Sequence, residues 1–128
     1  MLSPSQAFGQ SAESMAEDML RKKGYRILGK NLRIAGGELD LIADDQGTLV
    51  FIEVKARRGN QFGGAPYAIS TRKKQQIIKL ALCYLSQHGL TNTDCRFDVI
   101  LAVGTNEQTL QLTHIEQAFE VSSSTWQW

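Results

Sequence analysis

The chain has 128 residues, a length that suits one domain with a hydrophobic core of its own. Its 14 Lys and Arg residues nearly balance its 13 Asp and Glu residues, and its 42% hydrophobic content is ordinary for a soluble globular protein. No apolar stretch approaches the roughly 20 residues that span a bilayer, and the N-terminus lacks the basic start and apolar run of a secretory signal. Cys83 and Cys95 have no CxxC or metal-ligand spacing and are interpreted as free buried thiols rather than a disulfide or a zinc pair, so we expect a cytoplasmic protein.

The first predicted element is a helix that starts at Pro4 and Ser5 and ends at Gly24. Its apolar stripe, at helical spacing, consists of Phe8, Ala12, Met15, Ala16, Met19 and Leu20. Glu13 lies at the border of that stripe. A first strand is predicted from residue 25 to 34, and the two glycines that follow end it.

Acidic and aliphatic residues alternate from residue 38 to 43, which predicts a half-buried strand. The alternation places Leu39 and Leu41 on one face and the acids on the other. A turn at residues 45–47 then leads into a third strand, from residue 49 to 57.

Counting outward from that turn places Asp40 opposite Glu53, and Glu38 opposite Lys55, across a hairpin. Opposed carboxylates are unfavourable cross-strand neighbours. At about 5 Å and an effective dielectric near 20, their repulsion is roughly 3 kcal/mol before screening, whereas a surface Glu–Lys pair returns only about 0.2–1 kcal/mol. A bound divalent cation would turn the two acids into a site. A salt-bridge ladder with Lys55 is the alternative interpretation.

A long helix is predicted from Ser70 or Thr71 to about His88. Its buried stripe consists of Ile77, Leu80, Ala81, Tyr84 and Leu85. The same face, extended backward, includes Lys73 and Lys74. Lysines there need an anion or a carboxylate opposite them, unless both side chains reach solvent.

Two further strands are predicted, from residue 95 to 103 and from residue 109 to 115, and a short closing helix from residue 115 to 119. Asp98 lies beside Arg96 on the first of these strands, so we expect a structural ion pair between them.

Two segments are predicted to lack regular structure. Residues 59–64 form a Gly-rich loop, and residues 122–128 form a flexible tail after a single domain over residues 1–121. Phe62 and Tyr67 could stack on nucleic-acid bases or cap the core, and the sequence does not decide between these roles.

The basic residues are concentrated in two segments. Residues 21–33 and 55–79 hold every Lys and Arg except Arg96, and they contain no acid. Such segregation can form a cationic face for a phosphate backbone, although two solvated charge runs would give the same pattern. The candidate phosphate contacts are Arg33, Arg57, Arg58, Arg72, Lys73 and Lys74.

The strand pleat puts Asp40, Glu53 and Lys55 on one surface, with the two carboxylates close enough to share a cation. Hard divalent ions such as Mg²⁺ are bound by one or two carboxylates together with waters and substrate phosphate oxygens. A metal there would polarise a phosphoryl group and lower the pKa of a bound water, while Lys55 could orient the water and stabilise the phosphate. The three residues are sufficient for the hydrolysis of a phosphodiester.

Asp40, separated by twelve intervening residues from Glu53-Val54-Lys55, resembles the D…ExK signature of the PD-(D/E)XK nuclease superfamily. The chain is more closely similar to the uncharacterised bacterial YraN-like, endonuclease-like family. The stretches that resemble it are Glu13, Gly24–Leu28, Asn31–Arg33, Gly37–Ala43, Phe51–Arg57 and Arg96–Val99. Together they extend over roughly residues 7–118.

The resemblance implies an α/β, restriction-endonuclease-like fold with a mixed sheet of about four or five strands flanked by helices. Archaeal Holliday-junction resolvases, which have a similar layout, place a first-helix glutamate beside the metal, and Glu13 occupies that position here. Asp40 corresponds to the central ligand, and Glu53 and Lys55 to the ExK pair. The superfamily often has proline before the central aspartate, where this chain has Leu39.

The implied cofactor is Mg²⁺ or Mn²⁺, with Asp40, Glu53 and Glu13 as ligands. The implied partner is DNA, and the resolvase analogy suggests a homodimer. A catalytically inactive nucleic-acid-binding or protein-interaction module with the same fold is the alternative. Glu38 is interpreted as the partner of Lys55 or as an acid close to the metal. His88 and His114 look isolated, which disfavours nucleophilic catalysis.

Overall fold

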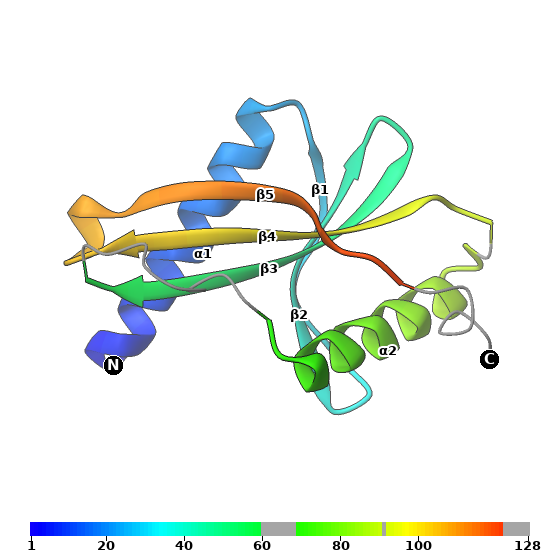
Figure 1. Ribbon diagram of the computed structural model, residues 1–128, viewed down its shortest axis with the longest axis horizontal. Coiled ribbons are helices and arrows are strands. Elements are labelled where there is room, and N and C mark those ends of the chain that lie inside the picture. Colours follow the sequence, from blue (N-terminus) through cyan, green and yellow to red (C-terminus); the bar gives the residue numbers. More distant parts are fainter. Residues whose placement is uncertain (60–68, 91, 122–128) are drawn as a thin grey trace.

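The computed structural model describes residues 1–59, 69–90 and 92–121, and it contains one five-stranded sheet with two α-helices (Figure 1). The elements are α1 (Pro4–Lys22), β1 (Arg26–Ile34), β2 (Gly37–Asp45), β3 (Thr48–Arg58), α2 (Thr71–Gln87), β4 (Cys95–Gly104), the 3-10 helix η1 (Glu107–Thr109) and β5 (Gln111–Phe119). The strand order is β1-β2-β3-β4-β5, with β3 and β4 parallel and the other pairs antiparallel. This mixed sheet confirms the predicted α/β, restriction-endonuclease-like architecture.

Several predicted features lie outside the described residues. They are residues 60–64 of the Gly-rich loop, the side chains of Phe62 and Tyr67, and the tail at residues 122–128. Within the described parts of the chain, neither helix is long and apolar enough to cross a membrane.

Each helix begins at a serine that caps it. The Ser3 side chain accepts the N–H of Gln6 at 3.1 Å, and the Gln6 side chain accepts the N–H of Ser3 at 2.9 Å, which forms a capping box. At α2, the Ser70 side chain accepts the N–H of Lys73 at 3.1 Å. Both helix starts therefore follow from local sequence.

The two helices pack against opposite faces of the sheet (Figure 1). Ala16 and Leu20 of α1 pack in one cluster with Val50 and Ile52 of β3. The α2 cluster contains Phe51 of β3 together with Ile77, Leu80, Ala81, Tyr84 and Leu85. The period-two pattern of β3 was predicted correctly, because its even and odd residues face different helices.

The start of β2 lies unusually close to α2. A Cβ atom built on Gly37 would be 2.8 Å from Leu80 Cδ1 and 3.2 Å from Gln76 Nε2. Position 37 therefore has no room for a side chain unless the ends of the Leu80 and Gln76 side chains move aside.

The predicted hairpin turn is confirmed between β2 and β3. Gln46 and Gly47 have φ values of 51° and 98°, and the N–H of Gly47 donates to Asp44 Oδ1 at 3.1 Å. Two positive φ values in a two-residue loop match the right-handed strand twist. The register is the expected one, from Asp45 and Thr48 to Leu41 and Ile52.

Two expectations for β2 were wrong. Pairing between β2 and β3 ends at Leu41 and Ile52, so the ladder does not reach Glu38 and Lys55. Leu39 packs in the α2 cluster and Leu41 in the α1 cluster, so they do not share a face. The cause is that β2 leaves β3 beyond Leu41 and continues to pair with β1.

The predicted closing helix at residues 115–119 was also wrong, because β5 continues to Phe119. Gln117 adopts a φ of 50° and donates its N–H to Asp98 Oδ1 at 3.0 Å. Phe119 stacks on Phe97 with ring centroids 5.0 Å apart. These tertiary contacts override a local pattern that is typical of a helix.

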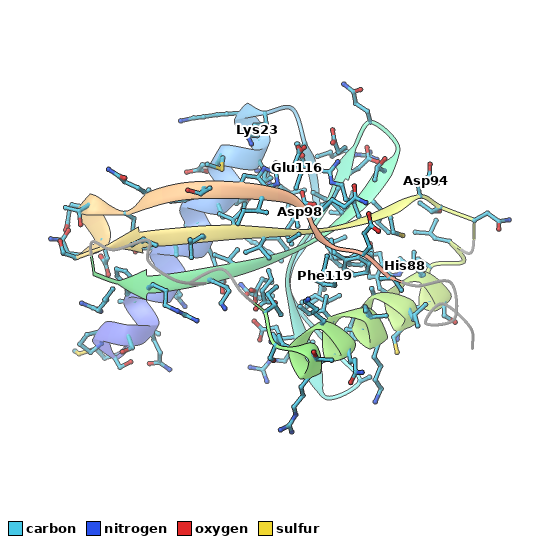
Figure 2. All side chains as sticks on the ribbon, in the orientation of Figure 1. Lys23, His88, Asp94, Asp98, Glu116 and Phe119 are labelled. Carbon is cyan, nitrogen blue, oxygen red and sulfur yellow. The ribbon has the colours of Figure 1, made fainter. Side chains whose placement is uncertain are left out.

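Asp98 is the centre of a buried polar network (Figure 2). Arg96 Nε donates to Asp98 Oδ1 at 2.9 Å, which confirms the predicted ion pair. His114 Nε2 lies 2.7 Å from Asp98 Oδ2, and Lys23 Nζ lies 2.9 Å from His114 Nδ1. Because the Lys23 ammonium can only donate, His114 carries its hydrogen on Nε2 and donates it to Asp98. The expectation that His114 is isolated was wrong.

Burial alone would raise the pKa of Asp98, but hydrogen bonds from His114, Arg96 and the Gln117 N–H outweigh it and hold that pKa below its ordinary value. The charged form is therefore favoured by folding. Its contribution to stability is present above the pKa of the unfolded chain and is lost as the pH falls through the lower folded value.

We predict that Asp98→Asn lowers the free energy of unfolding by about 3–5 kcal/mol at pH 7, because it leaves the Arg96 charge without its buried partner. Urea denaturation measures this loss. The difference from the wild type should shrink below pH 4, where the wild-type carboxylate takes up its proton. Glu107→Gln, at an exposed position, is the control and should change stability by less than about 0.5 kcal/mol. A loss below 1 kcal/mol in Asp98→Asn would contradict the prediction.

Candidate active site

The site is formed where β2 leaves β3. Asp40 is the residue directly beyond the last β2–β3 pair, and its Oδ2 accepts the N–H of Val54 at 2.9 Å. Val54 is paired with β4 on its other side. The Asp40 carboxylate therefore takes the place of a backbone acceptor from β2 and is held in the gap between the strands.

Glu53 meets Asp40 in this gap, and the two carboxyl groups are hydrogen-bonded to each other. The Glu53 side chain is only 16% exposed. Burial, followed by the charge of Asp40, raises the pKa of Glu53 to about 7. Burial also raises the pKa of Asp40, although the Val54 N–H and Glu53 oppose this. The pair thus shares a proton near neutral pH.

Two lysines lie beside the acid pair. Lys73 Nζ of α2 is 3.7 Å from Glu53 Oε1, which confirms that an inward-facing lysine of this helix has a carboxylate opposite it. Lys55 is half-buried, and burial, followed by the charge of Arg57, lowers its pKa. A cleft of about 440 Å³ joins these groups, and its lining is Glu53, Val54, Lys55, Ala56, Arg57, Ile69, Ser70 and Lys73.

Glu13 of α1 approaches Asp40 from the other side. Burial, and then the charge of Asp40, raises the pKa of Glu13. With its amide oriented to donate, Asn31 Nδ2 lies 2.9 Å from Glu13 Oε1 and 3.0 Å from Glu38 Oε1. Asn31 therefore joins two acids that would otherwise repel each other.

Sequence analysis missed the role of Asn31. Its φ of 50° is in the left-handed region, which Asn adopts more readily than most residues. An Asn among the strand-forming residues of β1 was the available signal. Sequence analysis expected an anion or a carboxylate opposite Lys73 without naming it, and the structure identifies that carboxylate as Glu53.

The other predicted phosphate contacts are dispersed. Arg57 lines the cleft, and Arg72 is exposed at the start of α2. Arg33 is 88% exposed and 3.9 Å from Glu38. Arg58 donates to the carbonyl oxygen of Pro4 at 3.2 Å and lies over the Phe8 ring, 4.6 Å from its centroid. Lys74 lies over the Phe119 ring, 5.7 Å from its centroid.

The donor set fits a hard divalent ion. Among the described residues, no three His, Cys, Asp or Glu side chains are grouped as a ready-made metal site. Two neighbouring carboxylates are nevertheless suitable ligands for Mg²⁺ or Mn²⁺, because these ions complete their coordination with waters and phosphate oxygens. Asp40 and Glu53 are the residues that could hold the ion. Coordination by Glu13 stays a prediction.

The family model of the uncharacterised protein family UPF0102 matches residues 12–102, which include Glu13, Asp40, Glu53, Lys55 and Lys73. The chain belongs to the UPF0102 family. This confirms the resemblance to the YraN-like, nuclease-like family of the PD-(D/E)XK superfamily that the motifs indicated.

UPF0102 proteins from several bacteria align with most of the chain. One from Hahella chejuensis is 50% identical over 93 residues, which are 73% of this chain and 75% of the relative. One from Symbiobacterium thermophilum is 39% identical over 115 residues, or 90% and 98% of the two chains. One from Pelotomaculum thermopropionicum is 44% identical over 112 residues, or 87% and 93%. Their names give the family and no activity.

We predict that Glu53→Gln stabilises the protein at pH 8. Because the folded pKa of Glu53 is raised, the native state binds this proton more tightly than the unfolded chain does, and stability falls as the pH rises towards 7. Gln imitates the protonated form, so the gain should be about 2 kcal/mol at pH 8 and should largely disappear at pH 4.5. Urea denaturation at both pH values measures it. A loss of stability at pH 8 would contradict the unfavourable interaction between the Asp40 and Glu53 carboxylates.

We predict that Asn31→Asp lowers the free energy of unfolding by about 1 kcal/mol at pH 8, because it replaces a shared donor with a third negative charge beside Glu13 and Glu38. Asn31→Gly keeps the left-handed backbone accessible and removes only the donor, so it should cost less than Asn31→Asp. Thermal unfolding of both variants gives the comparison. Equal stability of Asn31→Asp and the wild type would show that the amide does not bridge the acids.

Proposed function

We propose that this UPF0102 protein is a divalent-metal-dependent nuclease that hydrolyses phosphodiester bonds in DNA, with branched or structured DNA as candidate substrates. The observation that supports the proposal is the buried, hydrogen-bonded pair of Asp40 and Glu53 in the gap between β2 and β3. Without a cation this arrangement raises the pKa of both acids, which costs stability at neutral pH.

Asp40 and Glu53 would hold Mg²⁺ or Mn²⁺ in place of their shared proton, with Glu13 beside them. The bound metal would supply polarisation of the phosphoryl group and a lower pKa for a coordinated water. Because the pair must lose its proton on binding, metal affinity should rise with pH up to about 7.

Lys55 is the residue of the chain that would act on the phosphate. It is half-buried on β3, two residues after Glu53, and it lines the same cleft. Its ammonium group would orient the attacking water and stabilise the negative charge that develops on the phosphate. Arg57, in the wall of the cleft, would hold the DNA backbone next to the reacting group.

The remaining basic residues would extend the contact with DNA. Arg72 and Lys74 on α2, and Arg33 on β1, would bind phosphates at a greater distance from the acids. We also propose that the protein acts in the cytoplasm. A homodimer, as in junction resolvases, would bring two such clefts to one substrate.

We predict that Mn²⁺ raises the melting temperature of the wild type and has no such effect on Asp40→Asn. A metal at 100 times its dissociation constant adds about 2.7 kcal/mol to the free energy of unfolding. Glu17→Gln is the matched control, because the Glu17 side chain is 17% exposed but pairs with Arg21 away from the cleft. It should retain the full shift.

Cleavage of single-stranded, duplex, flap and four-way-junction DNA with Mn²⁺ then tests the activity, and an RNA substrate tests the choice of nucleic acid. Asp40→Asn and Lys55→Met should each reduce cleavage by about a hundredfold or more. Cleavage of no substrate by the wild type, despite salt-sensitive DNA binding, would favour the catalytically inactive module instead.

A further inference from the structure

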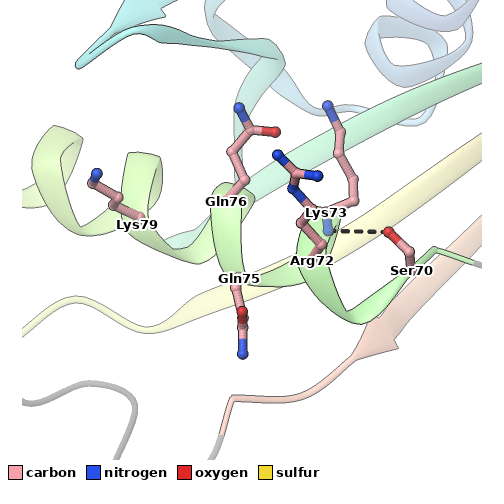
Figure 3. Close-up of a pocket in the computed structure, with 6 residues that line it drawn as sticks. All are labelled: Ser70, Arg72, Lys73, Gln75, Gln76 and Lys79. Carbon is pink, nitrogen blue, oxygen red and sulfur yellow. Dashed lines mark hydrogen bonds between the residues drawn. The ribbon is translucent and has the colours of Figure 1, made fainter.

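Lys73 lies between two hollows of the surface. It lines the cleft that contains Glu53, and it also lines a second hollow, of about 600 Å³, along α2. The other residues of that hollow are Ser70, Arg72, Gln75, Gln76 and Lys79. Figure 3 shows Lys73 and Gln76 extending in one direction from the helix and Gln75 in the opposite direction. Lys73 can therefore reach either the acid pair or the open side of α2.

The first turn of α2 directs the Lys73 side chain towards Asp40 and Glu53. Ser70 fixes the first turn through the Lys73 N–H. Ile77, one turn later on the same face, packs in one cluster with Phe51, which precedes Glu53 by two residues on the same face of β3. Lys74, the next residue, points to the ring of Phe119 instead.

The contact between Lys73 and Glu53 is loose. At 3.7 Å, the N–O distance suits an ion pair but exceeds that of a hydrogen bond. The Lys73 side chain is 42% exposed and has a flexible four-carbon stem. Moving its ammonium group away from Glu53 therefore breaks no close contact between the two.

A divalent ion held by Asp40 and Glu53 would compete with this ammonium group. It brings two positive charges where Lys73 brings one, and the two cations would repel each other at such a short separation. A substrate phosphate bound beside the metal would offer the displaced ammonium group a new negative partner.

We propose that Lys73 exchanges partners during the reaction: its ammonium group is the counter-ion of the Asp40–Glu53 pair in the metal-free protein, and it moves to a substrate phosphate once a metal binds. The proposal rests on the function proposed above for the same cleft. It gives α2 a direct part in the site, in addition to β2 and β3.

The test compares Lys73→Met, which keeps much of the side-chain length without its charge, with Lys74→Met as the matched control on the same helical turn. The Mn²⁺ midpoint is measured by thermal shift and calorimetry, without any substrate. Lys73→Met should bind Mn²⁺ about three- to tenfold more tightly than the wild type, because the competing cation is absent. Lys74→Met should show the wild-type midpoint.

Cleavage provides the second readout. Lys73→Met should cleave DNA about tenfold or more slowly than the wild type although it binds metal more tightly, and Lys73→Arg should restore part of the rate. Without metal, Lys73→Met should melt at a lower temperature than the wild type at pH 8, because the acid pair has lost its counter-ion. If Lys73→Met does not fold, Lys73→Gln takes its place.

Three other outcomes would separate the exchange of Lys73 from the proposed nuclease activity. An unchanged or weaker Mn²⁺ midpoint in Lys73→Met, with normal binding by the wild type, would overturn the exchange and leave the proposed nuclease intact. Failure of the wild type to bind Mn²⁺ at all would overturn both. An unchanged midpoint together with a raised KM would assign Lys73 to phosphate binding alone.

Discussion

The end of the β2–β3 ladder is the constraint on which the site depends. After Leu41 and Ile52, β2 no longer supplies acceptors to β3, and the N–H of Val54 is bound by the Asp40 side chain instead. A carboxylate that accepts a backbone N–H at a strand edge has little freedom to turn away. The gap therefore fixes one acid at the place where the next, Glu53, emerges from β3.

The surroundings of this gap explain why the acids stay close despite their repulsion. Hydrophobic clusters hold the hairpin from both faces, with Ile52 packed towards α1 and Phe51 towards α2. Each side also supplies a polar group to the acids, since α1 contributes Glu13 and α2 contributes Lys73. The free energy of packing is thus used to hold charges in an arrangement that an isolated hairpin would not adopt.

The fold was predicted well where local patterns decide it. The serine and glycine signals defined both helices, and the turn at Gln46 and Gly47 set the register that brings Asp40 to Glu53. The errors occurred where distant contacts decide the structure. A helical pattern became the end of β5 because Asp98 binds the Gln117 N–H, and alternation in β2 failed where that strand leaves its neighbour.

The candidate site was also predicted well from local patterns and poorly where distant contacts form it. Spacing along the chain was enough to pair the two acids and to place Lys55 beside them. It could not show that the Asn31 amide would lie between Glu13 and Glu38, or that Lys73 would pair with Glu53, because these contacts depend on how α1 and α2 pack against the sheet. Arg58, predicted as a phosphate contact, is engaged with Pro4 and Phe8 for a similar reason.

Gly37 lets the sheet and α2 pack closely. Its missing side chain makes room for the ends of the Leu80 and Gln76 side chains over the backbone of β2, so a methyl group there would push these two side chains out of their present positions. The fit of this helix against the sheet thus depends on a position outside the cleft itself.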